Sequence, residues 1–173
     1  MGDTIITIVA IFLVAILMFV FPLMSISERN DDISQLGVQT ATVEFIDDVR
    51  STGQITKDRY RAYLSTLAAT GNSYDVELEA KILDENPGKK AAAVDATKIG
   101  ENIYYSVYTS QIESEIDAGA YTLKEGDIIS ASVKNTNTTI SQMLKNFFYT
   151  ISGNTSYKVA AQHAGIVLTT AKK

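Results

Sequence analysis

The sequence predicts an α+β fold in which a long N-terminal apolar and amphipathic helix precedes a small head with an antiparallel sheet and short helices. No charged residue occurs from Thr4 to Ser27, and a helical apolar pattern continues to Arg50. The rest of the chain mixes strand and helix patterns without βαβ alternation, which favours an antiparallel sheet. We therefore expect three units: an apolar stem at residues 1–27, an amphipathic extension at 28–53 and a head at 54–173.

The stem is long enough to cross a membrane. Its 24 uncharged residues, from Thr4 to Ser27, rise about 1.5 Å each in a helix, or roughly 36 Å in total. The hydrocarbon core of a bilayer is about 30 Å thick. The first three residues contain no Lys or Arg, and the apolar run exceeds that of a secretory signal, so we expect a retained segment. Such a stem can lie in lipid or pack against copies of itself.

The helical pattern becomes one-sided after the stem. Pro22 removes one backbone hydrogen bond inside the apolar run, so we expect a bend there at a cost of about 3 kcal/mol. We expect the helix to end at Ser51–Gly53, with Gly53 as its terminator. Two neighbouring apolar stripes on the extension predict a broad buried face, formed by Ile33, Leu36, Val43 and Ile46 and by Val38, Thr42, Phe45 and Val49.

The head contains alternating short elements. A second helix should begin after the N-cap Thr56 and end at 70–72. Its apolar face should comprise Tyr60, Tyr63, Leu64 and Leu67. The later patterns predict a strand at 74–82, a loop at 85–90, an irregular stretch at 91–102, a helix at 104–116, a turn at 124–127, a strand at 128–134, a helix at 140–148, a turn at 152–155 and a last strand at 157–170, bent at Gly165.

The composition limits the function classes. The chain has 20 acidic and 15 basic residues, with a formal net charge of −5, and no basic stripe of the kind that follows a phosphate backbone. We therefore expect no direct nucleic-acid partner. The absence of cysteine removes disulfides and thiol chemistry from consideration.

Candidate catalytic and metal-binding groups are sparse. His163 is the only histidine, and no nucleophile pattern accompanies it, so a structural role is favoured. Glu113, Glu115 and Asp117 would be spread around a helix, and they lack the glycine and closing glutamate of a calcium loop. The same test excludes Asn30–Asp32 and Asp47–Asp48. We expect no enzyme activity, no metal site and no cofactor.

The N-terminal layout resembles that of type IV pilins. The likeness is carried by the apolar run from Ile5 to Met24, by Asp3 near its start and by the helix proline Pro22. The layout is also similar to that of pilin-like proteins found beside tight-adherence secretion genes. Type IV pilins carry a short basic leader and a glutamate near the helix start, whereas this sequence shows no leader and an aspartate. Either the numbering starts at the mature end, or the chain is a relative that skips processing.

The resemblance implies a structural subunit that forms a helical homopolymer with identical copies. Such a subunit would wait in the inner or plasma membrane and then enter a cell-surface or extracellular filament through an assembly or secretion machinery. The resemblance implies that Asp3 would then pair with the terminal amine of a neighbouring subunit, because a buried charge needs a partner. The stem has no flanking Trp or Tyr, which also favours a filament over a permanent span. The alternative is a monomeric, membrane-anchored extracytoplasmic binding or secretion-accessory protein. The residues predicted to form the assembly surface are Asp3, Ile5, Ile8, Phe12, Leu17, Phe21 and Pro22.

Overall fold

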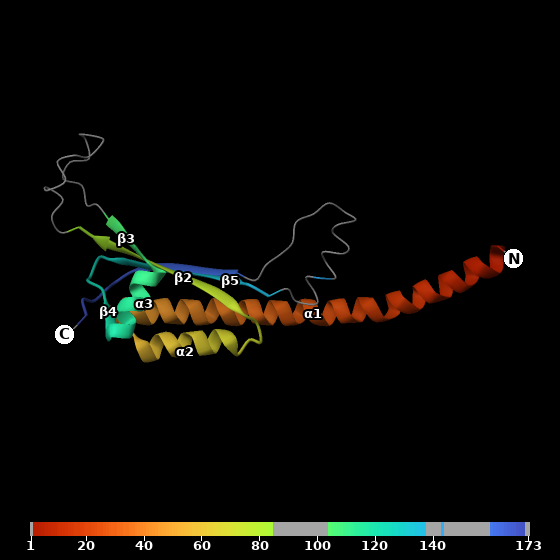
Figure 1. The fold of residues 1–173 in the computed structure, drawn as a ribbon, viewed down its shortest axis with the longest axis horizontal. Helices are drawn as coiled ribbons and strands as arrows, with labels where there is room; N and C mark the ends of the chain where they lie inside the picture. The colour runs from red at the N-terminus through yellow and green to blue at the C-terminus, as the bar shows by residue number, and fades with distance from the viewer. Residues whose placement is uncertain (1, 85–103, 138–142, 144–159, 172–173) are drawn as a thin grey trace, which may run out of the picture.

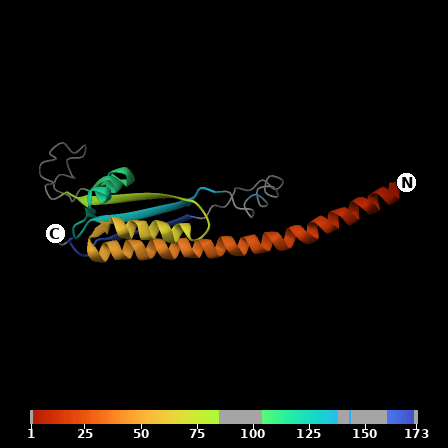
Figure 2. The ribbon, with the colours of Figure 1, turned by 60° about the horizontal axis from the view of Figure 1, so that its bottom comes forward.

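A computed structural model of the chain describes residues 2–84, 104–137, 143 and 160–171. One long helix, α1 (Gly2–Thr52), carries a head built from the later elements, and its N-terminal part projects beyond the head (Figures 1 and 2). The predicted loop at 85–90, the irregular stretch at 91–102 and the turn at 152–155 lie outside the described residues. So does the predicted helix at 140–148, apart from Met143.

Helix α1 ends where the sequence predicts. Gly53 adopts a left-handed φ of 69°, and its backbone N–H donates to the Val49 carbonyl at 2.8 Å. This is the geometry that favours glycine at a helix end. The stem and its extension are therefore one continuous helix of 51 residues, roughly 77 Å long.

Two antiparallel sheets form the β part of the head, which confirms the predicted α+β class. The larger sheet has the strand order β3-β2-β5-β6 and the smaller one pairs β1 with β4. The strands predicted at 74–82 and 128–134 are present as β2 and β5. The bounds are β1 Gln54–Thr56, β2 Tyr74–Leu83, β3 Tyr104–Tyr108, β4 Ala120–Thr122, β5 Ile128–Asn135 and β6 Ala160–Ile166.

The predicted second helix is also present, as α2 (Lys57–Ala68). The Thr56 side chain accepts a hydrogen bond from the Arg59 backbone N–H at 3.4 Å, as expected of an N-cap. Tyr60, Tyr63 and Leu67 are buried, whereas Leu64 is 37% exposed. Three of the four predicted contact residues therefore face the core.

Two predicted elements have different bounds from those expected. The helix predicted at 104–116 is wrong in its first five residues, which form β3; the helix itself is α3 (Thr109–Ala118). The aromatic run at 104–108 pairs with β2, with Tyr104 opposite Leu83 and Tyr108 opposite Glu79. The last strand ends at Ile166 instead of continuing to 170, and β6 continues through Gly165.

The chain after β6 forms a strap across the end of α1. The Leu168 N–H donates to the Arg50 carbonyl at 2.9 Å, and the Ala171 N–H donates to the Leu123 carbonyl at 3.1 Å. The Leu123 N–H in turn donates to the Gly53 carbonyl at 2.7 Å. These bonds tie the last residues of α1 to the residue that follows β4 and to the chain that follows β6.

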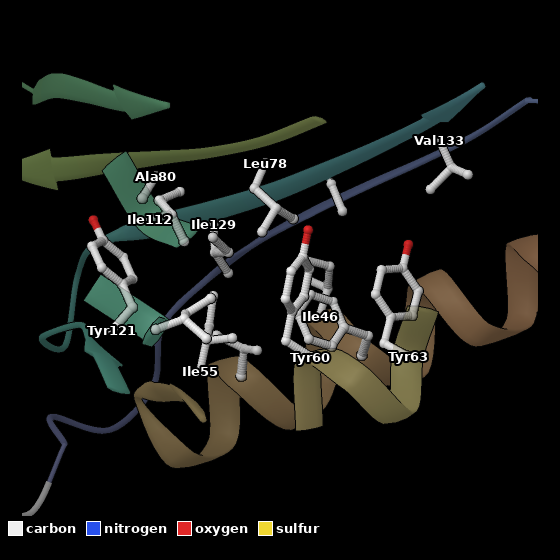
Figure 3. Packing of buried hydrophobic residues seen from close by; sticks show 14 of the residues in the cluster. Ile46, Ile55, Tyr60, Tyr63, Leu78, Ala80, Ile112, Tyr121, Ile129 and Val133 are labelled. Carbon is white, nitrogen blue, oxygen red and sulfur yellow. The ribbon is translucent and has the colours of Figure 1, made fainter. Parts of the chain in front are cut away.

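The core lies between the large sheet and the helices α1 and α2, where side chains from both layers meet (Figure 3). The rings of Phe45 and Tyr63 stack with centroids 4.3 Å apart. The Thr42 hydroxyl, itself buried, lies 3.1 Å from the Tyr63 hydroxyl, and the Tyr60 hydroxyl donates to Glu113 Oε1 at 2.8 Å. The polar ends of these side chains are therefore satisfied inside an apolar layer.

Three tyrosines in this core should make the head sensitive to alkali. Burial is the main cause that raises the pKa of Tyr60, Tyr63 and Tyr121 above the ordinary tyrosine value of 10.0; the Glu113 carboxylate adds to the effect at Tyr60. Above about pH 10 the unfolded chain releases protons that the folded head retains, so stability present below pH 10 is lost as pH rises. Each tyrosine can contribute up to about 1.4 kcal/mol per pH unit.

We therefore expect the free energy of unfolding, measured by urea titration of the detergent-solubilised chain, to be flat from pH 8 to 10 and to fall steeply by pH 11. Tyr60→Phe removes one of the three groups and should make the fall less steep. An equal slope in both proteins would contradict this assignment.

Candidate assembly surface on the stem helix

The stem is exposed along its length in this single chain. Its most apolar 18-residue window has a mean hydropathy of 3.1, and none of that window is buried. The helix is therefore long and apolar enough to cross a membrane. Of the predicted assembly residues, Ile5, Ile8, Phe12 and Phe21 are 60–69% exposed, and Leu17 is half-buried.

Asp3 lies in the first turn of α1. Its carboxylate is exposed, and its backbone carbonyl accepts a hydrogen bond from the Thr7 hydroxyl at 2.8 Å. A negative charge is favourable at this end of a helix, because the unpaired N–H groups there carry a partial positive charge. Asp3 is the only charged residue before Glu28, so any packing of the stem must accommodate it.

Pro22 lies within α1 without interrupting it. Its missing N–H leaves the Met18 carbonyl without the usual helical donor. The helix has a smooth bow over its N-terminal part, with no sharp break (Figures 1 and 2). Pro22 is exposed, so lipid or a second helix can contact the face on which it lies.

A charged collar, residues 28–32, separates the stem from the part of α1 that the head covers. Beyond this collar the structure corrects one expectation about burial. Ile33 and Leu36, predicted to face the core, are 61% and 66% exposed, whereas Ile46 from the same stripe is fully buried. The second stripe is buried as predicted at Val38, Thr42, Phe45 and Val49. The head thus covers one apolar face of α1 and leaves the other open.

Polar contacts fix α1 to the edge strand β6. The Gln35 side-chain amide donates to the Ala160 carbonyl at 2.6 Å and accepts from the Ala160 N–H at 3.1 Å. Fifteen residues further along α1, Arg50 Nε donates to the Ile166 carbonyl at 3.0 Å, and its guanidinium pairs with Asp47 at 2.7 Å. We call these contacts of Gln35 and Arg50 with β6 the seam. Because α1 is held at both ends of β6, the seam sets the orientation of the stem relative to the head.

Gly165 also contributes to the seam. A Cβ atom at this position would overlap the Arg50 side chain, so glycine allows the guanidinium to lie across the strand. The sequence pattern predicts a bend at Gly165 and gives no sign of this contact, which joins positions 115 residues apart.

Four of the acidic residues singled out in the sequence contact other side chains of the head or α1. Glu113 accepts from Tyr60, and Asp117 pairs with Lys57 at 2.8 Å, an interaction that lowers the pKa of the exposed Asp117 carboxyl. Asp48 pairs with Arg59 at 2.6 Å. His163 Nε2 lies 3.8 Å from Asp47 Oδ1. Within the described ranges, no group of three or more His, Asp or Glu side chains could hold a metal ion.

No protein-family model matches the chain, and no curated protein or solved structure is detectably similar to it. The resemblance to type IV pilins therefore stays a prediction that depends on the residues of α1.

Proposed function

We propose that this chain is a structural subunit that polymerises through the stem of α1 into a cell-surface filament. The membrane holds the stem before assembly, and identical copies replace the lipid afterwards. Two features support the proposal. The stem carries a continuous exposed apolar surface, and the described core of the head is built from α1 residues beyond position 37 and later elements, without contribution from the stem.

The open apolar face beyond the collar is the observation that carries the proposal. A bilayer that covers the stem ends near the charges of residues 28–32, because each charge placed at mid-membrane costs about 2.5–3.5 kcal/mol. Ile33 and Leu36 lie past that boundary and remain exposed. The acyl chains around the stem end before these residues, whereas a neighbouring protein helix can cover them. Burial of this pair by the stem helix of a second copy is what the filament supplies and a lone anchored copy does not.

Electron microscopy tests the proposal directly. Negative staining of material sheared from cells that produce the tagged chain should reveal filaments labelled by an antibody to the tag. The chain should be divided between a membrane pool and a sheared filament pool. A chain found entirely in the membrane fraction, with no labelled filaments, would favour the anchored monomer.

The exposed pair beyond the collar should be required for assembly. Burying an Ile or Leu side chain contributes roughly 1.5–3 kcal/mol. Replacing both residues should therefore strongly weaken each contact between subunits. We expect the double variant Ile33→Ser, Leu36→Ser to reduce sheared filament by at least tenfold while the melting temperature of the head is unchanged.

Leu168→Ser provides the control, because Leu168 is equally exposed at 61% but lies in the strap at the opposite end of the head. This variant should assemble normally. Normal filament yield from the Ile33, Leu36 double variant, or equal losses in both proteins, would show that the open face is not a subunit contact.

A further inference from the structure

Two oppositely charged side chains on α1, Asp3 and Arg29, lie too far apart to form an ion pair within one copy of the chain. Asp3 is the only charged side chain before position 28, and Arg29 is the only cationic side chain before Arg50. Both side chains are exposed, and neither forms an ion pair within the described part of the chain. They lie 26 positions apart on one continuous helix, or about 39 Å. They can therefore meet only between copies.

The helix faces that carry Asp3 and Arg29 have their next residues at the same intervals. Asp3, Thr7 and Ala10 follow each other at intervals of four and three, which places them on one helix face. Arg29, Ile33 and Leu36 repeat the same intervals. The first face is small and the second is large, so Ile33 and Leu36 would lie opposite Thr7 and Ala10 when the charges meet.

Thr7 can be covered at little cost. Its hydroxyl already donates to the Asp3 carbonyl at 2.8 Å, so burial would leave no unpaired donor and would present the methyl group outward. Arg50, the next cation along α1, is engaged by Asp47 and by the Ile166 carbonyl. Among the described residues of α1, Arg29 is therefore the cation toward which a neighbour's Asp3 can be directed.

We propose that Asp3 of one copy pairs with Arg29 of a neighbouring copy, the two helices being parallel and shifted by 26 residues. The pairing deepens the proposed filament and rests on it, because insertion into one membrane gives all copies the same direction. A carboxylate that leaves water needs a partner, and the planar guanidinium can bind it through two hydrogen bonds. The shift of about 39 Å exceeds the roughly 30 Å hydrocarbon core, so a stem seated in this way has left the bilayer.

Charge exchange tests the pair. Asp3→Arg and Arg29→Asp should each reduce the yield of sheared filament at least tenfold, and the double variant should restore it to within about threefold of the wild type. Both residues are exposed, so circular dichroism of all three variants should match the wild type. Filaments of normal yield from either single variant, or a double variant no better than the singles, would overturn the pairing.

Cysteine cross-linking tests the register with the charges intact. The chain contains no cysteine, so any disulfide must come from the introduced residues. Filaments from the Thr7→Cys, Ile33→Cys double variant should oxidise to covalent multimers. The Thr7→Cys, Gln39→Cys variant, with its second cysteine on another exposed face, should not.

The outcomes separate the pairing from the filament itself. Wild-type filaments combined with failed rescue and equal cross-linking in both cysteine variants would overturn the pairing and leave the filament proposal standing. A wild-type chain that forms no filaments would overturn both.

Discussion

Deletion of residues 2–27 should convert a membrane-bound chain into a soluble monomer with an intact head. The deleted segment contains fifteen Ile, Leu, Val and Phe residues. At about −0.3 to −0.6 kcal/mol each, these residues favour membrane insertion by roughly 5–9 kcal/mol. The described head core uses none of them, because its α1 contribution begins at Val38. Fractionation of cells should therefore show the full chain in the membrane or filament pools and the shortened chain in the soluble pool.

The shortened protein should sediment as a monomer and unfold at the same urea midpoint as the detergent-solubilised full chain. A variant that retains the stem and weakens the head, such as Gly53→Ala, serves as the control and should remain in the membrane fraction. A shortened chain that still pellets with membranes would show that the head has a membrane-binding surface of its own. A shortened chain that fails to fold would show that the stem stabilises the head.

Long periodic segments can be predicted from the sequence because their physics is local. The course of α1, its end at Gly53 and strands β2 and β5 follow from apolar periodicity and from one left-handed glycine. The short strands β1 and β4 cannot, since three residues are too few to show alternation. The helix predicted over 104–108 is wrong because the aromatic residues there also fit a helical spacing, and pairing with β2 decides between the two.

In the candidate assembly surface, too, some features follow from the local sequence and others depend on long-range contacts. The exposed stem follows from the absence of charge between Thr4 and Ser27. Which apolar face of the extension the head covers could not be predicted, because the stripe with Ile33 and the stripe with Val38 have similar patterns. Long-range contacts decide: Gln35 binds Ala160 and Arg50 binds Ile166, and together they orient α1 on β6. These contacts join residues more than 100 positions apart, beyond the reach of local pattern.

The seam also fixes how the head is oriented around the axis of its stem. Hydrogen bonds at both ends of β6 and the strap over Gly53 leave α1 little freedom to rotate beneath the sheet. Rotation matters because it sets the direction in which the exposed Ile33 and Leu36 side chains point. In the proposed filament, a rigid seam therefore fixes which surface of each head points outward once the stems have packed.

The strap at the end of α1 leads to the second large effect, expected for Gly53→Ala. Gly53 has a φ of 69°, where a side chain costs about 1–2 kcal/mol. A Cβ atom there would also overlap the Thr169 carbonyl oxygen and lie 2.7 Å from the Ala171 nitrogen. Both are backbone atoms, so the strap must move and its hydrogen bonds to Arg50 and Leu123 must weaken. We expect a total loss of about 3 kcal/mol or more in the free energy of unfolding.

Gly71→Ala isolates the contribution of the strap. Gly71 has a similar φ of 83°, but a Cβ atom at this position would have no neighbour within 4 Å, so only the backbone strain should appear. Urea unfolding of both variants should give a loss of about 1–2 kcal/mol for Gly71→Ala and a clearly larger one for Gly53→Ala. The difference measures the closure of the head over the end of α1. Equal losses would mean that the strap adapts freely and does not hold the helix.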